Sequence, residues 1–141
     1  MTPDQVAAIQ ASFGKVAPIS EQAAALFYGR LFEIAPEVKP LFRGDMKEQG
    51  RKLMATLAIA VNGLGDVASI LPAVSALAKR HVEYGVKPSH YQPVGAALLW
   101  TLERGLGEQW TPDLKVAWSE AYALLSQFMI DEAYGRSAAA E

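Results

Sequence analysis

The chain has 141 residues, a formal net charge of −2 at neutral pH, and no cysteine. At this length we expect one domain, residues 1–141, with a substantial buried core. The lack of cysteine excludes a disulfide framework, a thiolate metal site, an iron–sulfur cluster and a cysteine nucleophile. The nearly balanced charge gives no indication of nucleic-acid binding.

The N-terminus carries no targeting pattern. Its first fifteen residues lack the basic start and the apolar core of a signal peptide. The longest mostly apolar stretch, residues 53–61, is about half the length that a bilayer requires. We therefore expect a soluble, cytoplasmic protein without a membrane span, and a frayed tail over residues 137–141.

Three segments carry helix-start patterns. Residues 2–5 (Thr-Pro-Asp-Gln) combine a capping threonine, a proline at the first helical position and a glutamine three residues after the cap. Residues 111–113 (Thr-Pro-Asp) repeat the pattern, and Asp45 with Glu48 forms a weaker version.

Between these starts, apolar residues recur at the spacing of one helix face, and no useful length of strand alternation occurs. The sequence therefore predicts an all-α protein with about six major helices plus short ones. A short turn or helix is expected from Pro36 to near Phe42, and a helix stop with a loop over residues 62–66. The predicted stripes are Ala24, Phe27, Tyr28, Leu31, Phe32, Ala35; Met46, Gln49, Leu53, Leu57, Ala60, Leu64; Ile70, Val74, Leu77, His81, Tyr84; Tyr91, Val94, Leu98, Leu102; and Leu114, Ala117, Trp118, Ala121, Leu125, Phe128.

Three polar residues interrupt these stripes and need an explanation. His81 is either a core histidine satisfied by a backbone carbonyl or a neutral imidazole that binds a metal. Gln49 either turns its amide to solvent near a helix start or donates a hydrogen bond into a pocket. Tyr28 needs a partner for a buried hydroxyl, which is either a backbone carbonyl or a ligand.

The metal interpretation of His81 restricts the kind of site. A zinc site built by the protein needs three or four ligands, and a di-iron bundle needs Glu-x-x-His pairs. Residue 78 is Ala and residue 87 is Lys, so neither histidine has that glutamate. A single histidine suits a cofactor that brings its own equatorial ligands, and haem is the obvious case.

The sequence does not support a nucleotide-binding site or a serine nucleophile. Gly63-x-Gly65-x-x-Ala68 nominally fits a dinucleotide-binding fingerprint, but it follows a helical stripe instead of a strand. A phosphate-binding Walker loop and a G-x-S-x-G nucleophile motif are both absent from the sequence.

Taken together, several segments resemble the bacterial single-domain haemoglobins of the Vitreoscilla type and the globin domain of flavohaemoglobins. The resemblance covers nearly the whole chain and implies a globin fold that encloses one haem. The segments that carry it are Phe27–Phe32 with Pro36 and Pro40–Phe42, Gln49 with Arg51–Met54, Lys79–His81 with Tyr84–Val86, His90–Tyr91 with Val94–Gly95, and Ala117–Trp118 with Ala121–Tyr122.

This resemblance implies roles for individual residues around haem b. His81 would be the proximal iron ligand, and Phe42 would stack on the haem. Tyr28, Gln49 and Leu53 would form the distal pocket, where Tyr28 and Gln49 can donate hydrogen bonds to dioxygen. Arg80 would pair with a haem propionate. The expected wall of the pocket is completed by Leu57, Leu77, Val86, Tyr91 and Val94.

The sequence departs from the flavohaemoglobin pattern at two points. Tyr91 matches a tyrosine near the proximal histidine, but the matching glutamate position is Ala133, with Glu132 one residue earlier. One residue corresponds to about 100° of helix rotation. The resemblance also places no reductase within these 141 residues, so sustained turnover would need a separate one.

Three functions follow as alternatives. The first is reversible binding of dioxygen, and of CO and NO, for transport, storage or sensing. The second is nitric oxide detoxification by a dioxygenase that works with a separate reductase. The third is a haem-free helical sensor or interaction domain. The expected state is a monomer or a homodimer.

Overall fold

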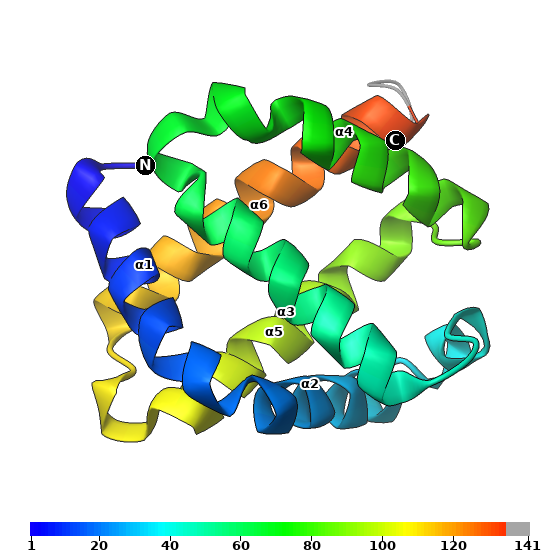
Figure 1. Ribbon diagram of the computed structural model, residues 1–141, viewed down its shortest axis with the longest axis horizontal. Helices are drawn as coiled ribbons and strands as arrows, with labels where there is room; N and C mark the ends of the chain where they lie inside the picture. Colours follow the sequence, from blue (N-terminus) through cyan, green and yellow to red (C-terminus); the bar gives the residue numbers. More distant parts are fainter. Residues whose placement is uncertain (135–141) are drawn as a thin grey trace.

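Six α-helices joined by short 3₁₀ turns make up the fold, which is seen in a computed structural model that describes residues 1–134 (Figure 1). This part of the chain contains no strand, so the predicted all-α class and the number of major helices are confirmed. The predicted tail at residues 137–141 lies outside the described residues. The helices are α1 (Pro3–Val16), α2 (Ser20–Ile34), α3 (Met46–Asn62), α4 (Val67–Glu83), α5 (Tyr91–Leu106) and α6 (Pro112–Tyr134); the turns are η1 (Ala17–Ile19), η2 (Pro36–Leu41), η3 (Leu64–Asp66), η4 (Pro88–His90) and η5 (Gly107–Gln109).

The first helix begins at the predicted capping box. The Thr2 hydroxyl accepts a hydrogen bond from the Gln5 backbone N–H at 3.1 Å, and the Thr2 backbone N–H donates to Gln5 Oε1 at 2.9 Å. The same chemistry starts α6, where Thr111 Oγ1 accepts from the Leu114 backbone N–H at 3.1 Å. Each hydroxyl satisfies a backbone donor that the first turn of a helix leaves free.

Of the weaker capping box predicted before α3, only the Asp45 cap is present. Asp45 caps the helix by accepting from the Lys47 backbone N–H at 2.9 Å. Glu48 does not complete a box, because its carboxylate lies 3.4 Å from the Arg51 guanidinium instead. The two exposed side chains are one helical turn apart, and such a pair stabilises a helix by roughly a few tenths of a kcal/mol at most.

The predicted helix stop at residues 62–66 is a tight turn. The Gly63 backbone N–H closes the last turn of α3 on the Ile59 carbonyl at 3.0 Å. A Cβ atom on Gly63 would lie 2.3 Å from Ile70 Cγ2, so only glycine lets α4 pack this closely against the turn. The chain therefore changes direction within η3, where α3 and the η3–α4 segment meet at a 42° bend.

The main core lies among α1, α2, α5 and α6. Ile9, Val16 and Leu31 are its largest fully buried side chains. Trp118 of α6 donates its indole N–H to Ser12 Oγ of α1 at 3.0 Å, and that hydroxyl donates to the Ile9 carbonyl at 2.8 Å. This chain of bonds joins the N-terminal helix to the C-terminal one and leaves no polar atom of the pair unsatisfied.

The helices α3 and α4 are attached to this core on different sides. In Figure 1, α2 runs along the bottom of the view, α4 along the top, and α3 crosses between them. α3 packs mainly on α2, where Gly50 allows an approach in which an added Cβ would lie 2.9 Å from Ala24 Cβ. α4 packs mainly on α6, and it contacts α3 far less than it contacts α6.

The apolar stripe of α4 ends earlier than predicted. Tyr84, predicted to continue the apolar stripe of α4, is its C-cap and is 56% exposed, so that part of the prediction is wrong.

Within residues 1–134, no individual helix combines the length and hydropathy of a membrane span. α3 and the η3–α4 segment reach them only jointly, across a 42° bend.

Candidate functional site

The inner faces of α3 and α4 stay half-buried although their sequence pattern is that of a core. On α3 these residues are Gln49, Leu53 and Leu57, and on α4 they are Leu77 and His81. Apolar surface left against water costs about 25 cal/mol per Å². Two half-buried apolar stripes that carry one histidine, one glutamine and a nearby tyrosine are the arrangement expected of a site for a large apolar group.

His81 has one ring nitrogen fixed by the backbone. Its Nδ1 lies 2.8 Å from the Leu77 carbonyl one turn earlier, and because a carbonyl only accepts, Nδ1 carries the proton. Burial lowers the pKa of His81 below 6.5, with a smaller lowering from Arg80 and an opposing effect of the carbonyl bond. The imidazole is therefore neutral at pH 7, and its Nε2 lone pair makes no hydrogen bond with residues 1–134.

This geometry bears on both interpretations of His81. The carbonyl bond is what a satisfied core histidine would make, but it uses only one of the two nitrogens. A metal-binding histidine makes the same bond, because donation from one nitrogen fixes the tautomer and orients the other toward the metal. The ring has two aromatic neighbours, Tyr84 and Tyr91, whose ring centroids lie 5.9 Å and 6.5 Å away.

Tyr28 and Gln49 are in direct contact. The Tyr28 hydroxyl donates to the main-chain carbonyl of Gln49 at 3.4 Å, which is long for a bond between two oxygens. Burial raises the pKa of Tyr28 to about 12, so the phenol keeps its proton at pH 7. The Gln49 side-chain amide makes no hydrogen bond with the described residues.

An aromatic cluster surrounds the Tyr28 ring. Phe42, just after η2, meets Tyr28 edge-to-face at 5.2 Å and meets Phe32 at 5.4 Å. Phe27 packs against the same ring at 5.1 Å. Phe32 was predicted as part of a helix stripe but not as a site residue; its position one turn after Tyr28 was the available indication.

A second group of tyrosines lies behind His81. Tyr91 is 8% exposed, and its hydroxyl is fully buried without a hydrogen-bond partner in residues 1–134. Burial and the neighbouring Tyr134 raise its pKa to about 12. Tyr134 donates to the Val86 carbonyl, and Tyr122 donates to the Tyr91 carbonyl at 2.6 Å. Glu132, one residue before the position at which the resemblance led us to look for a glutamate, is exposed and makes no hydrogen bond with the Tyr91 hydroxyl.

The remaining predicted residues occupy the same region with fewer specific contacts. Leu53, Leu57 and Val94 pack against the main core while staying half-buried. Arg80 is exposed on α4 and forms no ion pair within residues 1–134.

These residues fit a haem better than a protein-built metal site. Within residues 1–134 there is no group of three or more histidine, cysteine or carboxylate side chains that could hold a metal ion. One oriented imidazole is the donor that iron needs when a porphyrin supplies the other four nitrogens. The half-buried stripes carry the aliphatic side chains that such an apolar ring needs around it.

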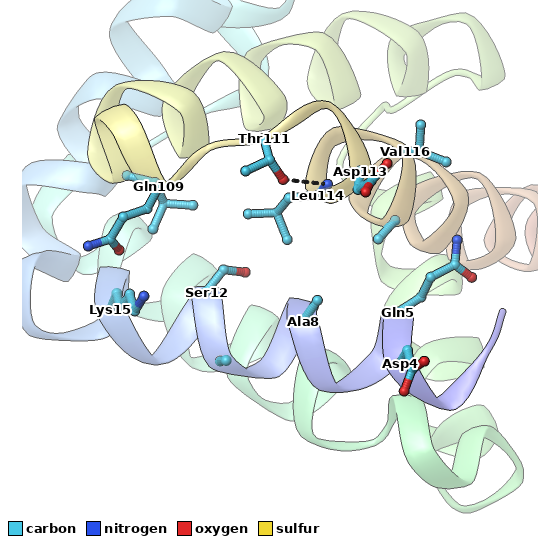
Figure 2. Close-up of a pocket in the computed structure, with 13 residues that line it drawn as sticks. Asp4, Gln5, Ala8, Ser12, Lys15, Gln109, Thr111, Asp113, Leu114 and Val116 are labelled. Carbon is cyan, nitrogen blue, oxygen red and sulfur yellow. Dashed lines mark hydrogen bonds between the residues drawn. The ribbon is translucent and has the colours of Figure 1, made fainter.

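An open groove lies elsewhere on the molecule. A groove of about 510 Å³ lies between α1 and the start of α6 (Figure 2). Ala8 of α1 and Leu114 of α6 line it from opposite sides, and its charged lining residues are Asp4, Lys15 and Asp113. None of the predicted site residues lines it, and its mixed charges favour no particular ligand.

Comparison with known proteins agrees with this description of the chain. Residues 25–129 match the Globin family. The chain is 35% identical to a flavohemoprotein of Rhodopirellula baltica over 82% of its own length and 29% of the relative, and 38% identical to one of Chromobacterium violaceum over 74% and 26%. A flavohemoprotein of Bordetella parapertussis is 31% identical over 92% of the chain and 33% of the relative. The chain thus spans a third or less of these relatives, and it belongs to the globin family.

Proposed function

We propose that the chain is a haem globin that binds haem b through His81 and takes dioxygen, CO or NO as a ligand on the side of Tyr28 and Gln49. The observation that carries the proposal is the His81 imidazole, held by the Leu77 carbonyl at 2.8 Å with its second nitrogen free within residues 1–134. The haem would supply an iron with one coordination position open to a diatomic molecule.

The chain's own residues would position this group. His81 holds it from the α4 side, and Phe42 stacks on it. The apolar wall would come from residues that are half-buried or buried in the structure, and the exposed Arg80 is the proposed partner of a propionate. The wall residues are Leu53, Leu57, Leu77, Val86, Tyr91 and Val94.

Tyr28 and Gln49 would stabilise the ligand. The raised pKa of Tyr28 keeps its phenol a donor, and the free amide of Gln49 provides a second one. A hydrogen bond to a ligand that carries negative charge contributes about 1–3 kcal/mol in a dry pocket. Two such donors would slow ligand release.

A second candidate is a nitric oxide dioxygenase supported by a separate reductase. It is favoured by the relatives, whose name joins a flavin to a haem. The donors of Tyr28 and Gln49 serve either function, because electrostatic stabilisation of the ligand also assists attack on it. The two functions are distinguished by ligand release and by turnover: very slow release argues against delivery, whereas catalytic loss of NO with an added flavin reductase and NADH supports the enzyme.

An absorption spectrum tests the proposal. The purified protein should show a Soret band that shifts sharply after reduction under CO. His81→Ala should lose haem, and added imidazole should restore it. His90→Ala is the matched control, because the His90 ring only accepts a hydrogen bond from the Lys87 backbone N–H. A folded, helical wild-type protein that takes up no haem would leave the haem-free interaction domain as the better explanation.

A further inference from the structure

The exposed face of α1 forms one wall of the open groove beside α6 (Figure 2). This face carries a stripe of four residues that line the groove and are all exposed, namely Asp4, Ala8, Ala11 and Lys15. Their spacing of 4, 3 and 4 residues places them on one side of the helix. The stripe is separate from the proposed haem site, because no residue of that site lines the groove.

The charges along the groove have an order. Figure 2 shows Asp4 toward one end, together with Asp113 of α6, and Lys15 toward the other end. Asp4 and Lys15 are eleven residues apart, or about 16 Å along a helix, so they do not pair with each other. None of the three forms an ion pair within residues 1–134. Both signs of charge therefore stay available to a partner.

This order is self-complementary under a two-fold rotation. The midpoint between Asp4 and Lys15 is also the midpoint between Ala8 and Ala11. If a second copy of α1 lies antiparallel across this point, Asp4 of each copy faces Lys15 of the other, and the alanines meet in the centre. A two-fold interface uses the same patch on both copies. The mixed charges, which favour no particular small ligand, are thus arranged to fit a second copy of the chain.

The middle of the stripe suits a close contact between helices. Helix axes approach within roughly 8–10 Å depending on the side chains between them, and alanine allows the shorter end of that range. Alanine also loses no rotamer freedom when it is buried. On the opposite wall of the groove, Val116 of α6 is 51% exposed. A helix that lies in the groove would cover this apolar side chain together with Ala8 and Ala11.

We propose that this face is a homodimer interface, in which α1 of each copy lies antiparallel in the groove between α1 and α6 of the other. Lys15 of one copy then meets Asp4 and Asp113 of the other at both ends. Only 13 residues of each copy line the groove, against roughly 20–30 per side in a stable interface. The dimer is therefore weak and depends on concentration, and higher ionic strength weakens it further.

Zero-length cross-linking tests the arrangement directly. A carbodiimide joins a carboxylate to an amine only where the two are in contact, and Asp4 and Lys15 of one chain are about 16 Å apart along the helix. A link between these two residues must therefore join two copies. In the full chain at high concentration, mass spectrometry of the cross-linked dimer should find this link. A dimer whose links all lie elsewhere would overturn the proposal.

Charge reversal followed by sedimentation velocity is the second test. Lys15→Glu opposes acidic side chains at both ends of the interface, and Asp4→Lys opposes basic ones. Each variant alone should raise the dimer Kd roughly 10-fold, since two attractive pairs become repulsive. Mixed in equal amounts, the two variants place opposite charges together at both ends and should dimerise about as well as the wild type. A mixture that stays as monomeric as its components would refute the antiparallel contact.

A change of size tests the same face without altering a charge. Ala8→Trp fills the centre of the groove and should abolish the dimer. The matched controls are Ala25→Trp and Lys52→Glu, which lie exposed on α2 and α3 and should dimerise like the wild type. If Asp4→Lys does not fold, Ala8→Trp and the cross-link decide. A chain that stays monomeric up to roughly 1 mM, or a dimer that survives both Lys15→Glu and Ala8→Trp, would overturn the interface.

Discussion

Replacing Tyr28 with Phe removes one hydroxyl from the proposed ligand site and little else. The ring would stay packed among Phe27, Phe32 and Phe42, whose centroids lie 5.1–6.0 Å from it. The lost bond to the Gln49 carbonyl is 3.4 Å long, so its contribution belongs at the lower end of the range for hydrogen bonds, about 0.5 kcal/mol. The free energy of unfolding should therefore change by less than about 1 kcal/mol.

The effect on ligand release should be much larger. A hydrogen bond to a charged acceptor contributes about 1–3 kcal/mol. Loss of the whole of that energy would make ligand release about 5-fold to 150-fold faster. The phenol has a single proton, so it must leave the Gln49 carbonyl to donate to a ligand. The cost of breaking that bond lowers the net effect by about 0.5 kcal/mol, so the expected acceleration of release is about 2-fold to 70-fold.

Stopped-flow displacement of dioxygen by CO measures the release rate, and urea unfolding measures the stability. Tyr122→Phe is the matched control, because its hydroxyl bonds the Tyr91 carbonyl at 2.6 Å and takes no part in the proposed ligand contacts. That variant should lose about 1 kcal/mol of stability and keep its release rate. A release rate that Tyr28→Phe leaves within twofold of the wild type would refute the donor role of Tyr28.

Further predictions concern stability. Tyr91→Phe removes a buried hydroxyl that lacks a partner within residues 1–134, so the free energy of unfolding should stay equal or rise; a loss above 1 kcal/mol, roughly, would contradict this. The pKa of Tyr91 is raised from 10.0 to about 12, so the folded state holds its proton longer, and stability should fall as pH rises from 10 to 12; urea titrations at each pH should show a smaller fall in Tyr91→Phe. Gly95→Ala would place a Cβ 2.5 Å from Tyr122 Cε2 and should cost about 1–3 kcal/mol in thermal unfolding. Gly14→Ala has nothing within 4 Å and should instead add about 0.5–1 kcal/mol; equal effects of the two alanines would refute the close packing of α5 and α6. Thr2→Ala should cost about 1 kcal/mol by removing the cap of α1, and helix content measured by circular dichroism should report it.

Local chemistry made much of the fold predictable. A capping hydroxyl acts within three residues, so Thr2 and Thr111 located two helix starts without knowledge of the rest of the chain. The unusual position of His81 in an apolar stripe was likewise visible from spacing alone. Asp45 was correctly predicted as a cap. Glu48 does not complete the capping box, because its carboxylate pairs with the Arg51 guanidinium instead.

The contacts between helices were less accessible to sequence reasoning. Tyr122 lies against Gly95 and Tyr134 reaches Val86 only because of how α6 crosses α5 and α4. Periodicity reports which face of a helix is apolar, but it does not report which residue of another helix meets it. That packing leaves the Tyr91 hydroxyl without a hydrogen-bond partner among residues 1–134.

The half-buried stripes on α3 and α4 have a consequence for the amount of folded protein in a cell. These stripes are half-buried in the structure, and the proposed haem would cover them. A ligand that binds only the folded state stabilises it by RT ln(1 + [L]/Kd), or about 2.7 kcal/mol at a concentration of 100 Kd. The level of this protein would then follow the supply of haem as well as the rate of its own synthesis, since chains made without haem would be the first to meet proteases.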